Sequence, residues 1–208
     1  MNCKTDNPPA AVDWGVASLA LHGETVSGDL HLVQPHAHGV LVAAVDGVGH
    51  GAEAAAAAKV AIATLTAHAH ASVLPLVRRC HDDLRETRGV VLTLASFKPL
   101  DGTITWAGVG NVEGVLLRAD AKGSPACDYV LMLGGVVGLQ LPPLRAFVIP
   151  VYPGDTLILA TDGIRGGFTE GLPLENSPQQ IADHVLSRHA KGTDDALVLV
   201  ARYLGGPS

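Results

Sequence analysis

The stretch that decides the fold is Val40-Leu41-Val42-Ala43-Ala44-Val45, which runs directly into Asp46-Gly47-Val48-Gly49-His50-Gly51. The first half is a continuous apolar run of strand length, as expected for a β-strand buried on both faces. The glycines after Asp46 indicate a turn, and the alanine-rich segment that follows, 51–71, has the apolar spacing of a helix. We therefore expect a buried strand, a carboxylate at its end and a helix packed beside it.

Two further helices carry recognisable start signals. A helix over 178–190 has Ser177 as its cap and Gln180 where a capping box needs it. A helix over 72–86 begins at Ser72, whose hydroxyl can cap its first turn. Both segments are therefore predicted to be helical from their first residues onward.

Strands make up most of the remaining chain. Asp101-Gly102 lies between two of them and is typical of a tight hairpin. Because the helices cluster in two places among many strands, we expect an α+β fold with packed sheets and outer helices, not a doubly wound sheet. The other predicted strands are 13–21, 30–33, 90–97, 103–109, 114–118, 129–133, 144–150, 156–160 and 196–204.

Composition excludes several classes of protein. The 208 residues are 48% hydrophobic with a formal charge of −6 and no basic cluster, which argues against nucleic acid as a partner. The sequence has no run of 18 uninterrupted apolar residues, so no membrane span is predicted. Residues 1–12 are expected to form an N-terminal arm and 13–204 a single domain. The three cysteines (Cys3, Cys80, Cys127) form no C-x-x-C pair and indicate free thiols in a reducing cytoplasm.

The acidic residues are unevenly divided, with 14 Asp against 6 Glu, and three of the aspartates share one context. Asp46 and Asp162 each end an apolar strand and precede a glycine, and Asp194 stands just before the last strand. If that last strand runs antiparallel to the others, all three carboxylates reach one rim. Like charges so close repel unless a cation lies between them, and short oxygen ligands suit Mg²⁺ or Mn²⁺.

Other interpretations of these motifs remain open at this stage. Asp-Gly is also a common turn dipeptide. Gly47-x-Gly49 resembles a fragment of a dinucleotide-binding loop, although Asp46 would face the pyrophosphate with like charge. His36-Ala37-His38 could form a two-ligand metal arm, but solvated or core histidines are the favoured interpretation. No Ser or Cys has a His/Asp setting that would indicate a covalent nucleophile.

The ordered set of motifs resembles the metal-dependent protein serine/threonine phosphatases, the PPM family, and most closely their bacterial SpoIIE-type branch. The resemblance spans residues 13–203. It is carried by Ser27-Gly28-Asp29, Asp46–Gly51, Gly108-Val109-Gly110-Asn111, Gly134-Gly135, Gly138, Pro153–Gly163 and Asp194–Val198.

The resemblance implies a four-layer α-β-β-α sandwich of two antiparallel sheets with a dinuclear metal site at one end. Asp46 should bridge two Mn²⁺ or Mg²⁺ ions, with the Gly47 carbonyl on one of them. Asp162 and Asp194 should complete the shell of the other ion, and Asp29 should act on the Gly47 side. Whether a third metal ion also binds is left open by the resemblance. A metal-bridging hydroxide would then attack phosphorus in line.

This sequence departs from the family pattern in two places. Val48 stands where eukaryotic members carry a His after the Asp-Gly, and the segment 22–26 offers no Arg to grip phosphate. We hypothesise that His50 or a metal-bound water donates the proton to the leaving oxygen.

The resemblance implies a cytoplasmic, monomeric phosphatase acting on phosphoserine or phosphothreonine. The bare-domain size resembles a feedback phosphatase of the bacterial stressosome, so stressosome-type scaffold proteins are the expected substrates. The alternatives are a catalytically silent binding module of the same fold and a metal-dependent phosphodiesterase or nucleotide phosphatase.

Overall fold

The apolar run at Val40–Val45 forms the centre of β3 (Gly39–Gly47) in the computed structural model, which describes residues 11–120 and 126–206. Leu41, Ala43 and Val45 belong to one apolar layer, whereas Val42 and Ala44 belong to another. The strand is therefore buried on both faces, as its unbroken hydrophobicity predicts.

Two sheets contain all the strands of the described residues. Every neighbouring pair is antiparallel except β5 and β8, which run parallel. The first sheet has the order β1 (Val12–Leu19), β11 (Ala196–Tyr203), β10 (Thr156–Ala160), β6 (Glu113–Leu117) and β7 (Cys127–Tyr129). The second has the order β2 (Asp29–His36), β3, β4 (Val90–Lys98) and β5 (Thr103–Val109), with β8 (Met132–Leu133) and β9 (Phe147–Pro150) both beside β5.

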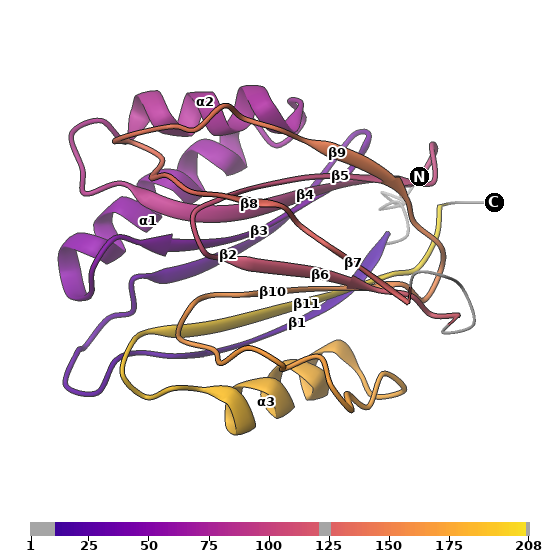
Figure 1. Ribbon diagram of the computed structural model, residues 1–208. Coiled ribbons are helices and arrows are strands. Elements are labelled where there is room, and N and C mark those ends of the chain that lie inside the picture. The colour runs from indigo at the N-terminus through magenta and orange to yellow at the C-terminus, as the bar shows by residue number, and fades with distance from the viewer. Residues whose placement is uncertain (1–10, 121–125, 207–208) are drawn as a thin grey trace, which may run out of the picture.

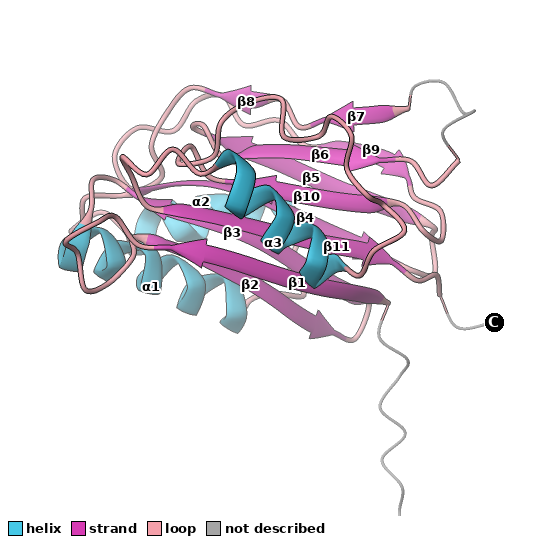
Figure 2. Ribbon diagram, turned by 90° about the horizontal axis from the view of Figure 1, so that it is seen from below, coloured by secondary structure: helices cyan, strands magenta, loops and turns pink. Residues whose placement is uncertain are grey.

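Helices cover the outer face of each sheet, which makes a four-layer α-β-β-α sandwich (Figure 1). The helices α1 (Gly51–Ala67) and α2 (Val73–Asp83) pack on the second sheet. Seen from below, α3 (Pro178–His189) lies across the first sheet (Figure 2). The predicted α+β class and layer order are confirmed.

Apolar side chains fill the three spaces between these layers. Phe97, Trp106 and Tyr203 are the aromatic side chains between the two sheets, and all three are almost fully buried. Leu65 lies in the layer under α1 and α2, and Ile181 in the layer under α3. No helix of the described residues is long and apolar enough to cross a membrane.

Several predicted boundaries differ from the structure. Residues 1–10, most of the predicted arm, lie outside the described residues together with Cys3, and Val12 already belongs to β1. The helix predicted over 51–71 ends at Ala67, and the helix predicted over 72–86 ends at Asp83.

The single strand predicted over 129–133 is wrong. Cys127–Tyr129 pairs with β6 in the first sheet, whereas Met132–Leu133 pairs with β5 in the second. Between them, Val130 is buried among the inter-sheet side chains and its N–H donates to the Gly114 carbonyl at 2.8 Å. The apolar character that predicted one strand therefore belongs to a segment that crosses between sheets.

Gly47 and Gly163 each follow an aspartate, and each lies so close to another backbone segment that no side chain would fit. A Cβ on Gly47 would lie 2.1 Å from the Ala54 carbonyl oxygen, so only glycine lets α1 pack this near the end of β3. A Cβ on Gly163 would lie 1.9 Å from the Asp195 carbonyl oxygen, where the chain after β10 meets the chain before β11. Each glycine brings its preceding aspartate beside another element of the candidate site.

Candidate metal centre

The predicted aspartates come from both sheets and meet at one end of the sandwich. β10 and β11 are antiparallel, so Asp162, after β10, and Asp194, before β11, lie at the same edge. Asp46 lies on the inter-sheet face of β3, since it continues the alternation of Val42 and Ala44. The single rim that the sequence predicts for these three carboxylates is therefore formed.

These three carboxylates line one pocket of about 230 Å³. The other lining residues are Val48, Gly49, His50, Val91 and Asn111. Asp29 and Gly47, which were also expected in the site, do not line the pocket. Asp29 is 3% exposed and pairs directly with Asp46 across β2 and β3, and the Gly47 N–H donates to the Gly28 carbonyl.

Neutral donors hold the carboxylates. Thr161 Oγ1 donates to Asp29 Oδ2 at 2.7 Å, and Asn111 Nδ2 donates to Asp162 Oδ2 at 2.7 Å. Asp194 Oδ1 accepts from the Asp195 N–H at 2.9 Å. Across residues 11–120 and 126–206, no Lys, Arg or His forms an ion pair with Asp29, Asp46, Asp162 or Asp194.

The electrostatic consequence is a large rise in two pKa values. Burial, together with the charges of Asp29, Asp162 and Asp194, raises the pKa of Asp46 from 3.8 to about 8. Burial likewise raises the pKa of Asp29, to about 7. The hydrogen bond from Thr161 lowers this pKa, but the effect of burial is larger. Negative charge is therefore held together here at a cost that a cation would relieve.

The donor set fits a hard divalent ion in its chemistry. The carboxylates offer only oxygen, the pocket is open to solvent, and the repulsion among them favours a bound positive charge. In the described part of the chain, no three His, Cys, Asp or Glu side chains lie close enough together to hold a metal ion.

Asp195 has a structural role that differs from that of Asp194. It is 3% exposed and accepts hydrogen bonds from the N–H groups of Leu21 at 2.8 Å and Gly28 at 2.7 Å. Both oxygens are thereby used to tie the segment before β2 to the start of β11.

His50 lies at the rim of the pocket. Its side chain is 60% exposed, and its Nδ1 lies 2.6 Å from Glu24 Oε1. Glu24 has no motif that would have indicated this contact from the sequence. Asn111 and Thr161 belong to motifs that carry the family resemblance, so their contacts with Asp162 and Asp29 could have been anticipated.

Arg88 is a cation beside the pocket that the sequence analysis missed. Its guanidinium pairs with Glu53 of α1, and a Cβ on Gly49 would lie 3.0 Å from Arg88 Nη1. The Val48 N–H donates to the Gly89 carbonyl at 3.1 Å, which holds the two segments together. A separation of about 40 residues along the chain leaves no local signal for this proximity.

Comparison with known proteins identifies the family. The family model of Stage II sporulation protein E (SpoIIE) matches residues 36–204. The chain therefore belongs to the SpoIIE family, within the PPM-type protein serine/threonine phosphatases. No curated protein matches the sequence significantly.

Solved structures share the fold. One, described as "The bacterial stressosome: a modular system that has been adapted to control secondary messenger signaling", is 30% identical, with a TM-score of 0.83 over 92% of this chain and 99% of that chain. RsbX in complex with magnesium is 18% identical, with a TM-score of 0.81 over 92% of this chain and 95% of that chain. The catalytic domain of the phosphatase PstP with two manganese ions is 17% identical, with a TM-score of 0.66 over 93% of this chain and 98% of that chain.

The raised pKa of Asp46 predicts the pH dependence of the metal-free fold. Because the folded-state pKa, about 8, lies above the ordinary 3.8, the stabilising contribution of this carboxyl is present at low pH and is lost as the pH rises through about 8. With a chelator present, Asp46→Asn should therefore gain stability relative to the unmutated chain between about pH 5 and about pH 9. Urea denaturation across this range measures the difference.

Asp101→Asn, at an exposed turn, is the matched control and should show no such trend. An Asp46→Asn difference that is constant with pH would contradict the electrostatic description of the pocket.

Proposed function

We propose that this chain is a divalent-metal-dependent phosphatase that removes phosphate from phosphoserine or phosphothreonine of a bacterial signalling protein in the cytoplasm. The observation that carries the proposal is that three aspartates from two sheets line one open pocket without a paired cation in the described residues. Family membership supports the reaction class. The likeness to a stressosome-related structure and to RsbX supports stressosome-type scaffold proteins as substrates.

Each aspartate would have a distinct part in holding two Mn²⁺ or Mg²⁺ ions. Asp46 projects from β3 toward the other sheet and would bridge the ions. Asp162 and Asp194 would hold one ion from the β10–β11 edge, and Asp29 with the Gly47 carbonyl would support the other. Bound divalent ions supply activation of water and neutralisation of phosphoryl charge. Asn111 and Thr161 would orient the carboxylates that they contact.

We propose that Arg88 binds the phosphate group of the substrate. Its guanidinium lies beside Gly49, which lines the pocket, and Glu53 fixes its position. A planar guanidinium matches two phosphate oxygens. Arg88, in the segment before β4, would thus supply the positively charged phosphate contact. The segment 22–26 contains no Arg that could do so.

The central test is phosphate release from a phosphorylated stressosome-type protein, with and without Mn²⁺. Asp46→Asn should lower the Mn²⁺-dependent rate by more than about 100-fold, since even residues that only orient metal ligands contribute about 10–100-fold. Asp101→Asn should retain the rate. Intact Mn²⁺-dependent release in Asp46→Asn would contradict the proposal.

A substrate panel separates the alternatives in the same assay. Release from phosphodiesters or nucleotides in preference to phosphoproteins would replace the proposed substrate class. Binding of no divalent ion, together with no release from any substrate, would favour the silent binding module.

Arg88→Ala should raise the KM for the phosphoprotein while changing kcat much less. The loss in kcat/KM should be about 10–100-fold, the range for a lost hydrogen-bonded charge, and Arg88→Lys should recover part of it. Arg85→Ala removes an exposed arginine that pairs with Asp82 and should leave both constants unchanged. Equal effects of Arg88→Ala and Arg85→Ala would remove Arg88 from the proposed site.

His50 is proposed as the proton donor to the leaving oxygen. Glu24 contacts its Nδ1, and no other hydrogen bond to the ring is found in the described residues. His50→Ala should therefore alter the high-pH limb of the pH–rate profile, where a general acid loses its proton. His22→Ala, at another exposed histidine, is the control, and an unchanged profile in His50→Ala would exclude this role.

A further inference from the structure

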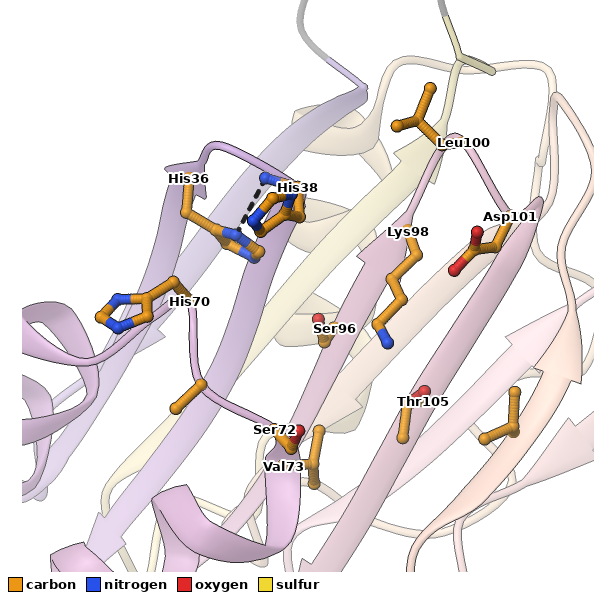
Figure 3. A pocket seen from close by; sticks show the side chains of 12 residues that line it. His36, His38, His70, Ser72, Val73, Ser96, Lys98, Leu100, Asp101 and Thr105 are labelled. Atoms are coloured by element: carbon orange, nitrogen blue, oxygen red, sulfur yellow. Dashed lines mark hydrogen bonds between the residues drawn. The ribbon is translucent and has the colours of Figure 1, made fainter.

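A second cavity, of about 440 Å³, lies at the far end of the second sheet from the aspartates. His36 and His38 flank it at the β2–β3 hairpin, and Lys98 extends along β4 on its other side (Figure 3). Asp29 is the first residue of β2 and His36 the last, so the two pockets are about 23 Å apart along this strand. The cavity is therefore separate from the candidate metal centre.

The polarity of this cavity follows from where the helix layer ends. On the outer face of β4, Leu92 and Leu94 pack under α1 and α2. Ser96 and Lys98 continue the same face by the two-residue alternation of a strand, but they lie beyond the turn that joins the two helices. Thr105 pairs with Ser96 across β4 and β5 and lies on the same face. The sheet thus changes from an apolar to a polar surface at the cavity.

Two polar groups that line the cavity form no hydrogen bond with the described residues, and one of them, the Nε2 atom of His36, is itself buried. Ser96 is 5% exposed, and no described residue forms a hydrogen bond with its hydroxyl. The Nε2 of His36 is buried and also has no partner in the described residues. Because the Nδ1 of His36 accepts from the His38 N–H at 3.3 Å, the proton of the neutral ring lies on Nε2. The Ser96 hydroxyl can therefore donate a hydrogen bond to a ligand in the cavity, whereas the Nε2 atom of His36 is closed to solvent.

Two of the residues that line the cavity, Lys98 and Asp101, carry opposite formal charges. Lys98 forms no ion pair with any described residue, and Asp101 is the one carboxylate that lines the cavity. Burial lowers the pKa of His36, and the charges of His38, His70 and Lys98 lower it further, so the His36 ring is neutral at neutral pH.

The N-terminus of α2 also faces the cavity through Ser72 and Val73. Ser72 occupies the cap position, but its side chain accepts no cap hydrogen bond, in contrast to the prediction from the sequence. The N–H groups of Val73 and Leu74 are therefore left for another acceptor, whereas Pro75, the third residue of the helix, has no N–H.

We propose that this cavity binds a small oxyanion, either inorganic phosphate or a small-molecule phosphate monoester. The hydroxyls of Ser96 and Thr105, the Lys98 ammonium and the helix N-terminus are all donors, which is the set that phosphate oxygens require. The volume lies within the usual range of small-ligand sites. Leu100 and Val148, both exposed at the rim, offer apolar contact for the organic part of an ester.

A metal ion does not fit the same cavity. The imidazoles of His36, His38 and His70 do not form a group close enough to hold a metal in the described part of the chain, and the Lys98 ammonium would repel a cation.

The test is titration of the full chain with inorganic phosphate and with adenosine monophosphate, in the presence of a chelator. The NMR signals of the histidine rings and calorimetry report binding. Saturable binding should occur in the unmutated chain and equally in Asp46→Asn, because the cavity is independent of the metal centre. Lys98→Ala should weaken binding by about tenfold or more, whereas Lys59→Ala, an exposed lysine on α1, should not.

The phosphatase activity of Lys98→Ala should equal that of the unmutated chain, and its far-ultraviolet circular dichroism should show an intact fold. Tighter binding of the nucleotide would identify an ester as the ligand, and tighter binding of phosphate would identify the free ion. No saturation by either anion up to about 10 mM, or equal affinity in Lys98→Ala, would overturn the proposal.

Discussion

The register that places Asp29 directly opposite Asp46 is the constraint on which the candidate site depends. Residues paired this way have Cβ atoms about 4.5–5.5 Å apart, and like charges directly opposite destabilise a sheet. The register cannot slip by one residue, because Leu30 and Leu32 would then turn from the helix layer toward the other sheet. Packing of the apolar residues thus holds two buried carboxyls together against their repulsion.

The other sheet brings further acidic groups to the same place. Asp162 and Asp194 meet because β10 and β11 are antiparallel and because Gly163 permits contact with the Asp195 backbone. Asp195 fastens the two sheets at this end by accepting from the N–H groups of Leu21 and Gly28. The negative charge is therefore concentrated by the fold itself, in a pocket that faces solvent.

The sequence was most informative where a short pattern determines structure by itself. The apolar run before Asp46 predicted a strand buried on both faces, and the capping box at Ser177 and Gln180 is present in α3. The carboxylates at strand ends predicted a shared rim, since antiparallel strands bring alternate ends together. These features depend on periodicity and on neighbouring residues, which a single sequence displays.

Features that depend on long-range contacts were not predictable in this way. Arg88 reaches the pocket only through the contacts of the segment before β4 with Val48 and Gly49. The 129–133 segment was assigned to one strand because burial between two sheets gives the same apolar signal as burial within one. His36, interpreted from the sequence as solvated or as part of the core, instead lines a cavity with His70, which follows α1 in the chain.

The central claim is that the buried aspartates form a divalent-metal centre. Anomalous diffraction from crystals soaked in Mn²⁺ tests it most directly, because manganese can be located without reference to activity. The account predicts two anomalous peaks about 3.5–4 Å apart in the pocket between Asp46, Asp162 and Asp194. A fully soaked crystal with no peak in this pocket would contradict it.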